Sequence, residues 1–159
     1  MTKNDIPVTP AVRLLRDNGI EFVPYEYHYE EKGGTAQTAR ELNVDEHLVI
    51  KTLVLEADAS VFLMLMHGDK EVSLKELARV LGVKAVHPCD SKKAMNATGY
   101  MFGGTSPFGT KKNLSLCVEE SIFNLDKIFI NGGKRGFIVG IKPDVLKKLF
   151  KVSLVNVAI

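Results

Sequence analysis

Lys51 stands in the middle of a largely apolar segment, residues 48–55, whose composition is typical of a β-strand. Side chains alternate between the two faces of a strand, so Lys51 shares the face of Val49 while Thr52 lies on the other. The ammonium must therefore either reach solvent along the strand surface or project into a cavity. A partly desolvated cation in a cavity can hold a carbonyl oxygen or a phosphate. Lys51 is accordingly a candidate for catalysis, with a solvent-exposed edge lysine as the alternative.

Glycine is concentrated in two short segments of the second half of the chain, residues 99–109 and 131–136. Loops of this kind bring bare backbone N–H groups close to a ligand, although ordinary tight turns use glycine in the same way. Two such segments in one small domain favour a binding site built from backbone amides.

Two familiar motifs begin within the first of these segments, and neither is complete. Gly104-x-Ser106 starts like the nucleophile turn of serine hydrolases, but the next residue is Pro107, which has no N–H to donate to an oxyanion. Gly104 and Gly109 have the spacing of a phosphate-binding P-loop, but Lys111 stands one position too late. We therefore expect neither a serine hydrolase nor a P-loop nucleotide site.

The cysteines and histidines have no spacing that is typical of a metal site or of a catalytic pair. Cys89 and Cys117 are far apart in the sequence. The four histidines form no H-x-x-x-H pattern; they are His28, His47, His67 and His87. We therefore expect no metal, no cofactor and no Ser–His or Cys–His nucleophile. Having only two cysteines also excludes a disulfide scaffold and favours a reducing compartment.

These candidate residues must be positioned by a mixture of helices and strands. Helices are predicted from capping patterns and apolar periodicity, and strands from runs of β-branched residues. Two capping boxes are present, Thr38-x-x-Glu41 and Ser73-x-x-Glu76. Helices are expected over 10–18, 38–43, 74–81, 91–97 and 143–150, and strands over 20–29, 49–56, 61–66, 84–87, 114–118, 127–131, 137–141 and 152–157. This order predicts one α/β domain over residues 1–159, with helices packed on a mixed sheet.

The net charge of +2 is divided unevenly along the 159 residues. Residues 1–83 hold 9 Lys and Arg against 14 Asp and Glu, which is −5, whereas residues 84–159 hold 12 against 5, which is +7. The second half carries basic doublets at Lys111–Lys112 and at Lys134–Arg135. Such asymmetry is typical of contact with nucleic acid, and a solvated surface is the alternative.

The sequence predicts neither a membrane segment nor export. The longest strongly apolar run is residues 61–66, far short of the roughly 20 residues that a membrane helix needs. Residues 1–5 have no apolar stretch of the kind found in a secretory signal. We therefore expect a cytoplasmic protein without a membrane partner.

Three segments of the chain stand out together. In chain order they are Ile50-Lys51-Thr52-Leu53, then Thr98-Gly99-Tyr100 through Gly103-Gly104-x-Ser106-Pro107-x-Gly109, and finally Asn131-Gly132-Gly133-Lys134-Arg135-Gly136. They resemble, in register, the YbaK/EbsC family of bacterial aminoacyl-tRNA deacylases, which is related to the editing domain of prolyl-tRNA synthetases. The resemblance covers nearly the whole chain. It implies a curved, largely antiparallel mixed β-sheet or barrel flanked by helices.

The resemblance also implies roles for individual residues. Lys51 matches the lysine that members of the family need, and Gly103 matches a backbone contact near the substrate carbonyl. Tyr27 matches a pocket tyrosine, and Tyr25 and Tyr29 are close enough to take its place. The other residues implied in substrate binding are Thr52, Gly104, Ser106, Asn131, Gly132 and Gly133. Asn131 stands where other members have a small residue such as serine.

The implied activity is hydrolysis of the ester between tRNA and a wrongly attached amino acid. The resemblance favours Cys-tRNA(Pro), and also Cys-tRNA(Cys), with the substrate thiol attacking its own ester while Lys51 and glycine amides hold it. The tRNA acceptor end would be contacted by the basic residues Lys111, Lys112, Lys134 and Arg135. A prolyl-tRNA synthetase is an implied candidate partner. The alternative is a non-catalytic module of the same fold that binds tRNA or a synthetase.

Overall fold

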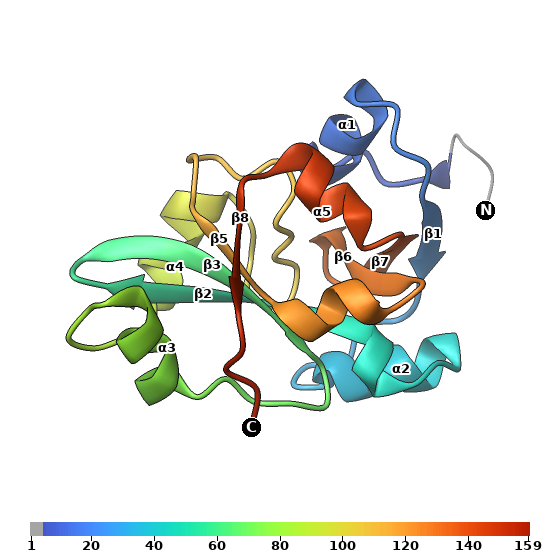
Figure 1. The fold of residues 1–159 in the computed structure, drawn as a ribbon. Coiled ribbons are helices and arrows are strands. Elements are labelled where there is room, and N and C mark those ends of the chain that lie inside the picture. The colour runs from blue at the N-terminus through green and yellow to red at the C-terminus, as the bar shows by residue number, and fades with distance from the viewer. Residues whose placement is uncertain (1–4) are drawn as a thin grey trace.

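One mixed β-sheet organises the molecule, which the computed structural model describes over residues 5–159 (Figure 1). The sheet has eight strands in the order β1-β7-β6-β2-β3-β5-β8, with β4 beside β2. The strands are β1 (Val23–Glu26), β2 (Val49–Ala57), β3 (Ser60–His67), β4 (His87–Pro88), β5 (Leu116–Glu119), β6 (Ile128–Lys134), β7 (Phe137–Ile141) and β8 (Val152–Val155). The helices are α1 (Pro10–Asp17), α2 (Gly34–Leu42), α3 (Leu74–Leu81), α4 (Ser91–Thr98) and α5 (Asp144–Leu149), with short 3₁₀ turns η2 (Glu46–Leu48) and η3 (Glu120–Asn124). The mixed α/β fold expected from the sequence is confirmed.

The sheet combines antiparallel and parallel pairs and remains open. β1 pairs with β7, β7 with β6, and both β3 and β4 with β2, all antiparallel. The ladders β2–β6, β3–β5 and β5–β8 are parallel. Within residues 5–159, β1 and β8 are the two edges and do not pair with each other, so the sheet is not a closed barrel. Pro24 suits the edge position of β1, because proline has no N–H for a second ladder.

The start of α2 differs from the sequence prediction. The helix begins at Gly34, so Thr38, predicted to cap it, lies inside the helix. The Thr38 hydroxyl instead donates weakly to the Gly34 carbonyl at 3.4 Å and contacts the Tyr27 hydroxyl at 2.6 Å. A threonine inside a helix can bond the carbonyl four residues back, which is why the capping pattern misled. Ser73, in contrast, caps α3 as predicted, and Gly82 ends that helix in a left-handed conformation.

Two predicted strands are much shorter in the structure. The segment 20–29 contributes only Val23–Glu26 to the sheet, and 84–87 is replaced by the two-residue strand His87–Pro88. Both lie at margins of the sheet, where a strand has one partner at most and its length is not set by neighbours on both sides. The other predicted elements lie close to their observed positions.

Helices cover both faces of the sheet. In β3, Leu63 and Leu65 face a core cluster that includes side chains of α1 and α5, whereas Met64 and Met66 face a second cluster that includes α3. A third cluster packs Ala39 of α2 against β2, β6 and β7. Burial on both faces explains why β2 and β3 are continuous apolar runs without alternation.

The helices of residues 5–159 are all too short or too polar to cross a bilayer. The expectation that no secretory signal is present depends partly on residues 1–4, which lie outside the described part of the chain.

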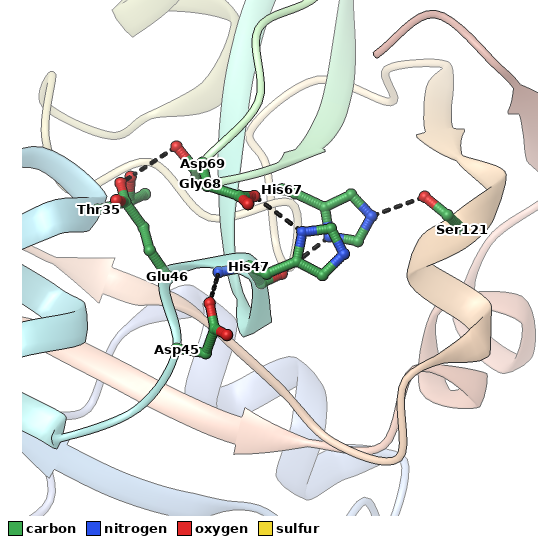
Figure 2. Close-up of polar contacts among 8 residues, drawn as sticks. All are labelled: Thr35, Asp45, Glu46, His47, His67, Gly68, Asp69 and Ser121. Carbon is green, nitrogen blue, oxygen red and sulfur yellow. Dashed lines mark hydrogen bonds and ion pairs between the residues drawn. The ribbon is translucent and has the colours of Figure 1, made fainter. Parts of the chain in front are cut away.

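A polar cluster joins η2, β3 and η3 (Figure 2). His67 is fully buried at the end of β3; its Nδ1 lies 2.8 Å from the backbone oxygen of His47, and its Nε2 lies 2.7 Å from Oγ of Ser121. The two imidazole rings stack with centroids 3.7 Å apart, and Nδ1 of His47 lies 2.8 Å from Oδ1 of Asp69. Because a carbonyl only accepts, Nδ1 of His67 carries the proton and Ser121 donates to Nε2.

Burial lowers the pKa of His67, because its imidazolium form is poorly solvated inside the protein. The hydrogen bond to His47 and the nearby carboxylates of Asp69 and Glu119 act in the opposite direction, and the charge of His47 acts in the same direction as burial. The ring is therefore neutral in the folded protein at neutral pH.

We expect acid to destabilise the protein partly through His67. The unfolded chain binds this proton near the ordinary pKa of about 6.5, before the folded chain does, so the free energy of unfolding falls as the pH drops below that value. The contribution to the slope is at most about 1.4 kcal/mol per pH unit. Chemical denaturation at a series of pH values measures it.

Two variants test whether His67 causes this part of the pH dependence of the free energy of unfolding. His67→Asn, whose amide can still donate to the His47 carbonyl, should lose this part of the pH dependence, and Ser121→Ala should keep it. An unchanged slope in His67→Asn would contradict the assignment.

Candidate active site

The candidate site begins where β2 and β6 separate. Their parallel ladder joins residues 49–50 to residues 129–130 and then ends. The next residues are Lys51 on β2 and Asn131 on β6. Residues at matching positions of neighbouring strands point to the same face of a sheet, so these two side chains share the face of the third core cluster.

Lys51 is partly covered, and its ammonium has a counter-ion. The side chain is 19% exposed, and Nζ lies 3.7 Å from the carboxylate of Glu71, which is 82% exposed. The stem of the lysine is thus buried while its charge reaches the surface. Glu71 also exchanges two backbone hydrogen bonds with Ile159, at 3.0 and 2.9 Å. The sequence did not indicate Glu71, because no local pattern shows that the chain after β3 returns to β2.

The two glycine segments lie against each other, and Asn131 joins them. Its Nδ2 donates to the Gly103 carbonyl at 3.1 Å, and its Oδ1 accepts from the N–H groups of residues 133 and 134 at 2.7 and 3.2 Å. Gly104 packs so closely that a Cβ there would lie 2.9 Å from the backbone nitrogen of Arg135. The structure therefore brings together two segments that the sequence marked separately.

The backbone amides of the first glycine segment are not equivalent. The Gly104 N–H donates to the Met101 carbonyl at 2.9 Å, so it is already used. The Gly103 N–H has no partner among residues 5–159, and its φ of +85° is a conformation that favours glycine. Of the Gly103 and Gly104 N–H groups, which are the candidates for holding an ester, only that of Gly103 is free within the described residues.

Tyr29 is the tyrosine that reaches Gly103. A Cβ added to that glycine would lie 2.5 Å from the Tyr29 hydroxyl. The hydroxyl of Tyr27 lies 2.6 Å from Oγ1 of Thr38, and burial raises the pKa of Tyr27. Tyr25 packs edge-on against an aromatic ring of β6. Tyr29 thus contacts the glycine loop, and a role of Tyr27 in substrate binding stays a prediction.

Gly132 and Gly133 are required by close packing around the third motif. Thr9 donates to the Gly132 carbonyl at 2.6 Å, which fixes the start of α1 to β6. A Cβ on Gly132 would lie 2.5 Å from the ring of Phe137, and one on Gly133 would lie 2.8 Å from the ring of Tyr100. These contacts set the shape of the turn, and contact of either glycine with substrate stays a prediction.

Thr52 and Ser106 direct their hydroxyls into the protein. Thr52 lies on the face of β2 opposite to Lys51, and its Oγ1 is buried without a hydrogen-bond partner in the described part of the chain. Ser106 is fully buried, and its Oγ accepts a hydrogen bond from the Phe108 N–H at 3.2 Å. Ser106 thus stabilises the loop, and substrate contact by either hydroxyl stays a prediction.

The basic residues predicted to contact tRNA are all exposed; they are Lys111, Lys112, Lys134 and Arg135. The first doublet follows the glycine loop and donates its two N–H groups to carbonyls at the end of α4, at 3.0 and 2.9 Å. The second doublet lies at the β6–β7 turn, against Gly104. One basic doublet therefore follows the glycine loop and another packs against its middle.

The structure shows one Ser–His contact that the sequence did not reveal, between Ser121 and His67 (Figure 2). The two residues are 54 positions apart, so no local motif reveals them. The second ring nitrogen of His67 faces a carbonyl in place of a carboxylate, and burial opposes the imidazolium that a general base must form. His67 also pairs with Ile50 and so lies on the sheet face opposite to Lys51. We assign this pair a structural role.

Two further features lie outside the candidate site. Residues 5–159 contain no group of three or more His, Cys, Asp or Glu side chains that could hold a metal ion. A cavity of about 920 Å³ lies among α1, β1, β7 and α5, and none of the predicted site residues lines it. The residues predicted from the sequence therefore lie apart from this cavity.

Comparison with known proteins places these features in a family. A family profile for the aminoacyl-tRNA editing domain matches residues 30–149. A protein of Enterococcus faecalis, described as a candidate Cys-tRNA(Pro)/Cys-tRNA(Cys) deacylase EbsC, is 29% identical over 143 residues, 89% of this chain and 87% of that protein. A proline–tRNA ligase of Desulfotalea psychrophila is 27% identical over 96 residues, 60% of this chain but 16% of that enzyme.

Solved structures share the fold at lower identity. A candidate trans-editing enzyme for prolyl tRNA synthetase superposes with a TM-score of 0.81 at 18% identity, covering 95% of this chain and 98% of the other. A likeness at this identity concerns the fold. The family profile, however, spans most of the chain and includes Lys51 and both glycine segments. The chain therefore belongs to the aminoacyl-tRNA editing domain family.

Proposed function

We propose that this member of the editing family is a deacylase that acts in trans on mischarged tRNA, with Cys-tRNA(Pro) as its main substrate and Cys-tRNA(Cys) as a second. The observation that carries the proposal is the meeting of the Lys51 strand, Asn131 and Gly103 where β2 and β6 separate. The similarity to the Enterococcus faecalis protein, which extends over most of both chains, supports this substrate class.

An aminoacyl ester makes modest demands on a catalyst. The neighbouring α-ammonium already makes its carbonyl electrophilic, so the site needs mainly to hold the substrate and to stabilise an oxyanion. The unpartnered Gly103 N–H and the Lys51 ammonium are suited to that task. The Glu71 carboxylate opposite Lys51 is largely exposed, so exchanging it for the developing oxyanion costs little.

The nucleophile in this proposal is the thiol of the substrate. Its sulfur bonds to the ester carbonyl carbon, the bond from that carbon to the ribose oxygen breaks, and the ribose oxygen takes up the thiol proton. Water then opens the cyclic thioester to give free cysteine. An intramolecular thiol has a large effective concentration. Burial raises the pKa of both Cys89 and Cys117, which lowers the thiolate fraction of the protein's own cysteines.

A non-catalytic module that binds tRNA or a synthetase is the second candidate. The similarity to part of a proline–tRNA ligase favours this module. The same similarity suggests a prolyl-tRNA synthetase as the candidate partner. Incubation with a panel of mischarged tRNAs separates the two. Release of the amino acid supports the deacylase, and binding without release supports the module.

We expect Lys51→Ala to lower the rate of deacylation by about 10²–10³-fold, the usual effect of removing an oxyanion donor. The fold should persist, because the lost ion pair is long and its glutamate is exposed. Single-turnover deacylation gives the rate, and thermal unfolding reports on the fold. Ser121→Ala serves as the control and should keep the parent rate. A folded Lys51→Ala variant with parental activity would remove Lys51 from the mechanism.

The thiol mechanism predicts strong discrimination between two substrates that differ by one atom. Seryl-tRNA should be deacylated about 100-fold more slowly than cysteinyl-tRNA, because a hydroxyl is the poorer nucleophile. Cys89→Ala and Cys117→Ala should retain most activity on the cysteinyl ester. Equal rates on the two esters, or an aminoacyl group trapped on a protein side chain, would refute the mechanism.

Binding to tRNA should depend on salt through the exposed basic doublets. Replacing Lys111 and Lys112 with alanine should reduce the slope of log K against log salt by about 1–2, since each lost phosphate contact removes somewhat less than one. Filter binding across a salt series measures the slope. The matched control replaces Lys147 and Lys148, a basic doublet in the last turn of α5 that is not part of the predicted tRNA contact. An equal loss in both variants would show that the loop doublet has no special place in binding.

A further inference from the structure

Phe102 is the most exposed large apolar side chain in the described part of the chain. It is 79% exposed, and its neighbour Met101 is 56% exposed. Burial of a phenylalanine side chain contributes about 1.5–3 kcal/mol to the free energy of folding, and most of this contribution is not gained at Phe102. Exposed apolar groups that form a patch next to a functional site are typical of a binding surface.

The backbone that presents Phe102 is held firmly. Nε of Arg135 donates to the Phe102 carbonyl at 2.7 Å, and the next carbonyl, of Gly103, accepts from Asn131 at 3.1 Å. The guanidinium of Arg135 lies 5.1 Å from the ring centre of Tyr29. The backbone of Phe102 is thus held by the same contacts that assemble the candidate site, and its ring projects into solvent.

The surroundings of Phe102 identify the chemistry of its ligand. Arg135, which binds the backbone carbonyl of Phe102, and the exposed Lys134 next to it supply positive charge to this part of the surface, and Gly103 follows Phe102 directly in the chain. An exposed aromatic ring on a basic surface suits an unpaired nucleotide, because the base can stack on the ring while the phosphates pair with nearby cations. A purely apolar partner would leave this charge unused.

We propose that Phe102 stacks on a base of the unpaired 3′ end of the tRNA and thereby positions the ester at Gly103. The inference rests on the proposed function, since it takes the ester-bearing end of tRNA as the ligand. Only a nucleotide close to the aminoacylated terminus can reach both residues, because they are neighbours in the chain. Phe102 is a positioning residue in this scheme and takes no part in the chemistry.

The absence of tryptophan from the sequence makes a direct test practicable. Phe102→Trp places a single fluorophore at the proposed stacking position, and Val80→Trp on α3, where Val80 is 46% exposed, is the matched control. The probe is an RNA hairpin that carries no amino acid; it consists of an acceptor stem with an unpaired 3′ overhang ending in CCA. Two reference hairpins carry either an abasic overhang of the same charge or no overhang.

We expect the overhang hairpin to quench Phe102→Trp fluorescence with the same Kd that anisotropy gives, and to leave Val80→Trp unchanged. The abasic and blunt hairpins should not quench. No quenching, equal quenching by the three hairpins, or a change produced only by an added prolyl-tRNA synthetase would overturn the proposal.

Kinetics provide a second reading of the same residue. Phe102→Ala should raise KM for aminoacylated tRNA by about 5- to 150-fold, the equivalent of one lost stacking contact, with a much smaller effect on kcat. Phe102→Tyr should restore the parental KM. A parental KM in the alanine variant would overturn the proposal and leave the deacylase assignment intact. Quenching by the hairpin that carries no amino acid, together with no cleavage of aminoacylated tRNA in the kinetic assay, would support the stacking and refute the deacylase.

Discussion

The parallel ladder between β2 and β6 joins only two residue pairs before the strands separate. β2 pairs with β3 and β6 pairs with β7 along their other edges, so beyond Ile50 and Ile130 only the edges that face each other lose their ladder. Lys51 and Asn131 are the first residues past the last pair. The candidate site thus lies where this pairing stops.

Glycine at this fork serves close approach more than flexibility. The 99–109 loop and the β6–β7 turn touch through backbone atoms, and at Gly104 a single methyl group would collide with the main chain of Arg135. Asn131 makes one hydrogen bond across to the Gly103 carbonyl and accepts two within its own turn. An asparagine at the head of the third motif therefore has a structural task that a serine, with a shorter side chain and one oxygen, would perform differently.

Much of the fold could be predicted from local sequence patterns, because capping and apolar runs are local properties. Ser73 and Gly82 delimit α3 as expected, and the β2–β3 hairpin follows its apolar runs. Thr38 misled because a hydroxyl inside a helix bonds the preceding turn as readily as a hydroxyl at its start caps it. Capping patterns therefore predict that a helix exists more reliably than where it begins.

The candidate site could be predicted only in part. Its three motifs are visible in the sequence, but the choice among the tyrosines depends on the register of β1 against β7, which no local pattern sets. The partners of Lys51 and His67 are Glu71 and Ser121, residues of ordinary type that only the path of the chain brings near. The sequence likewise does not distinguish Phe102 from a core phenylalanine, because its exposure is set by the path of the loop.

The hydrogen bonds between Glu71 and Ile159 have a practical consequence for handling the protein. Because Glu71 is the counter-ion of Lys51, any peptide joined after Ile159 starts next to the electrostatic environment of that lysine. An affinity tag rich in histidine or acidic residues, if joined directly after Ile159, would place new charge there and alter the apparent behaviour of the purified enzyme. For kinetic measurements, a tag is better attached at a position that does not lie next to the Lys51–Glu71 ion pair.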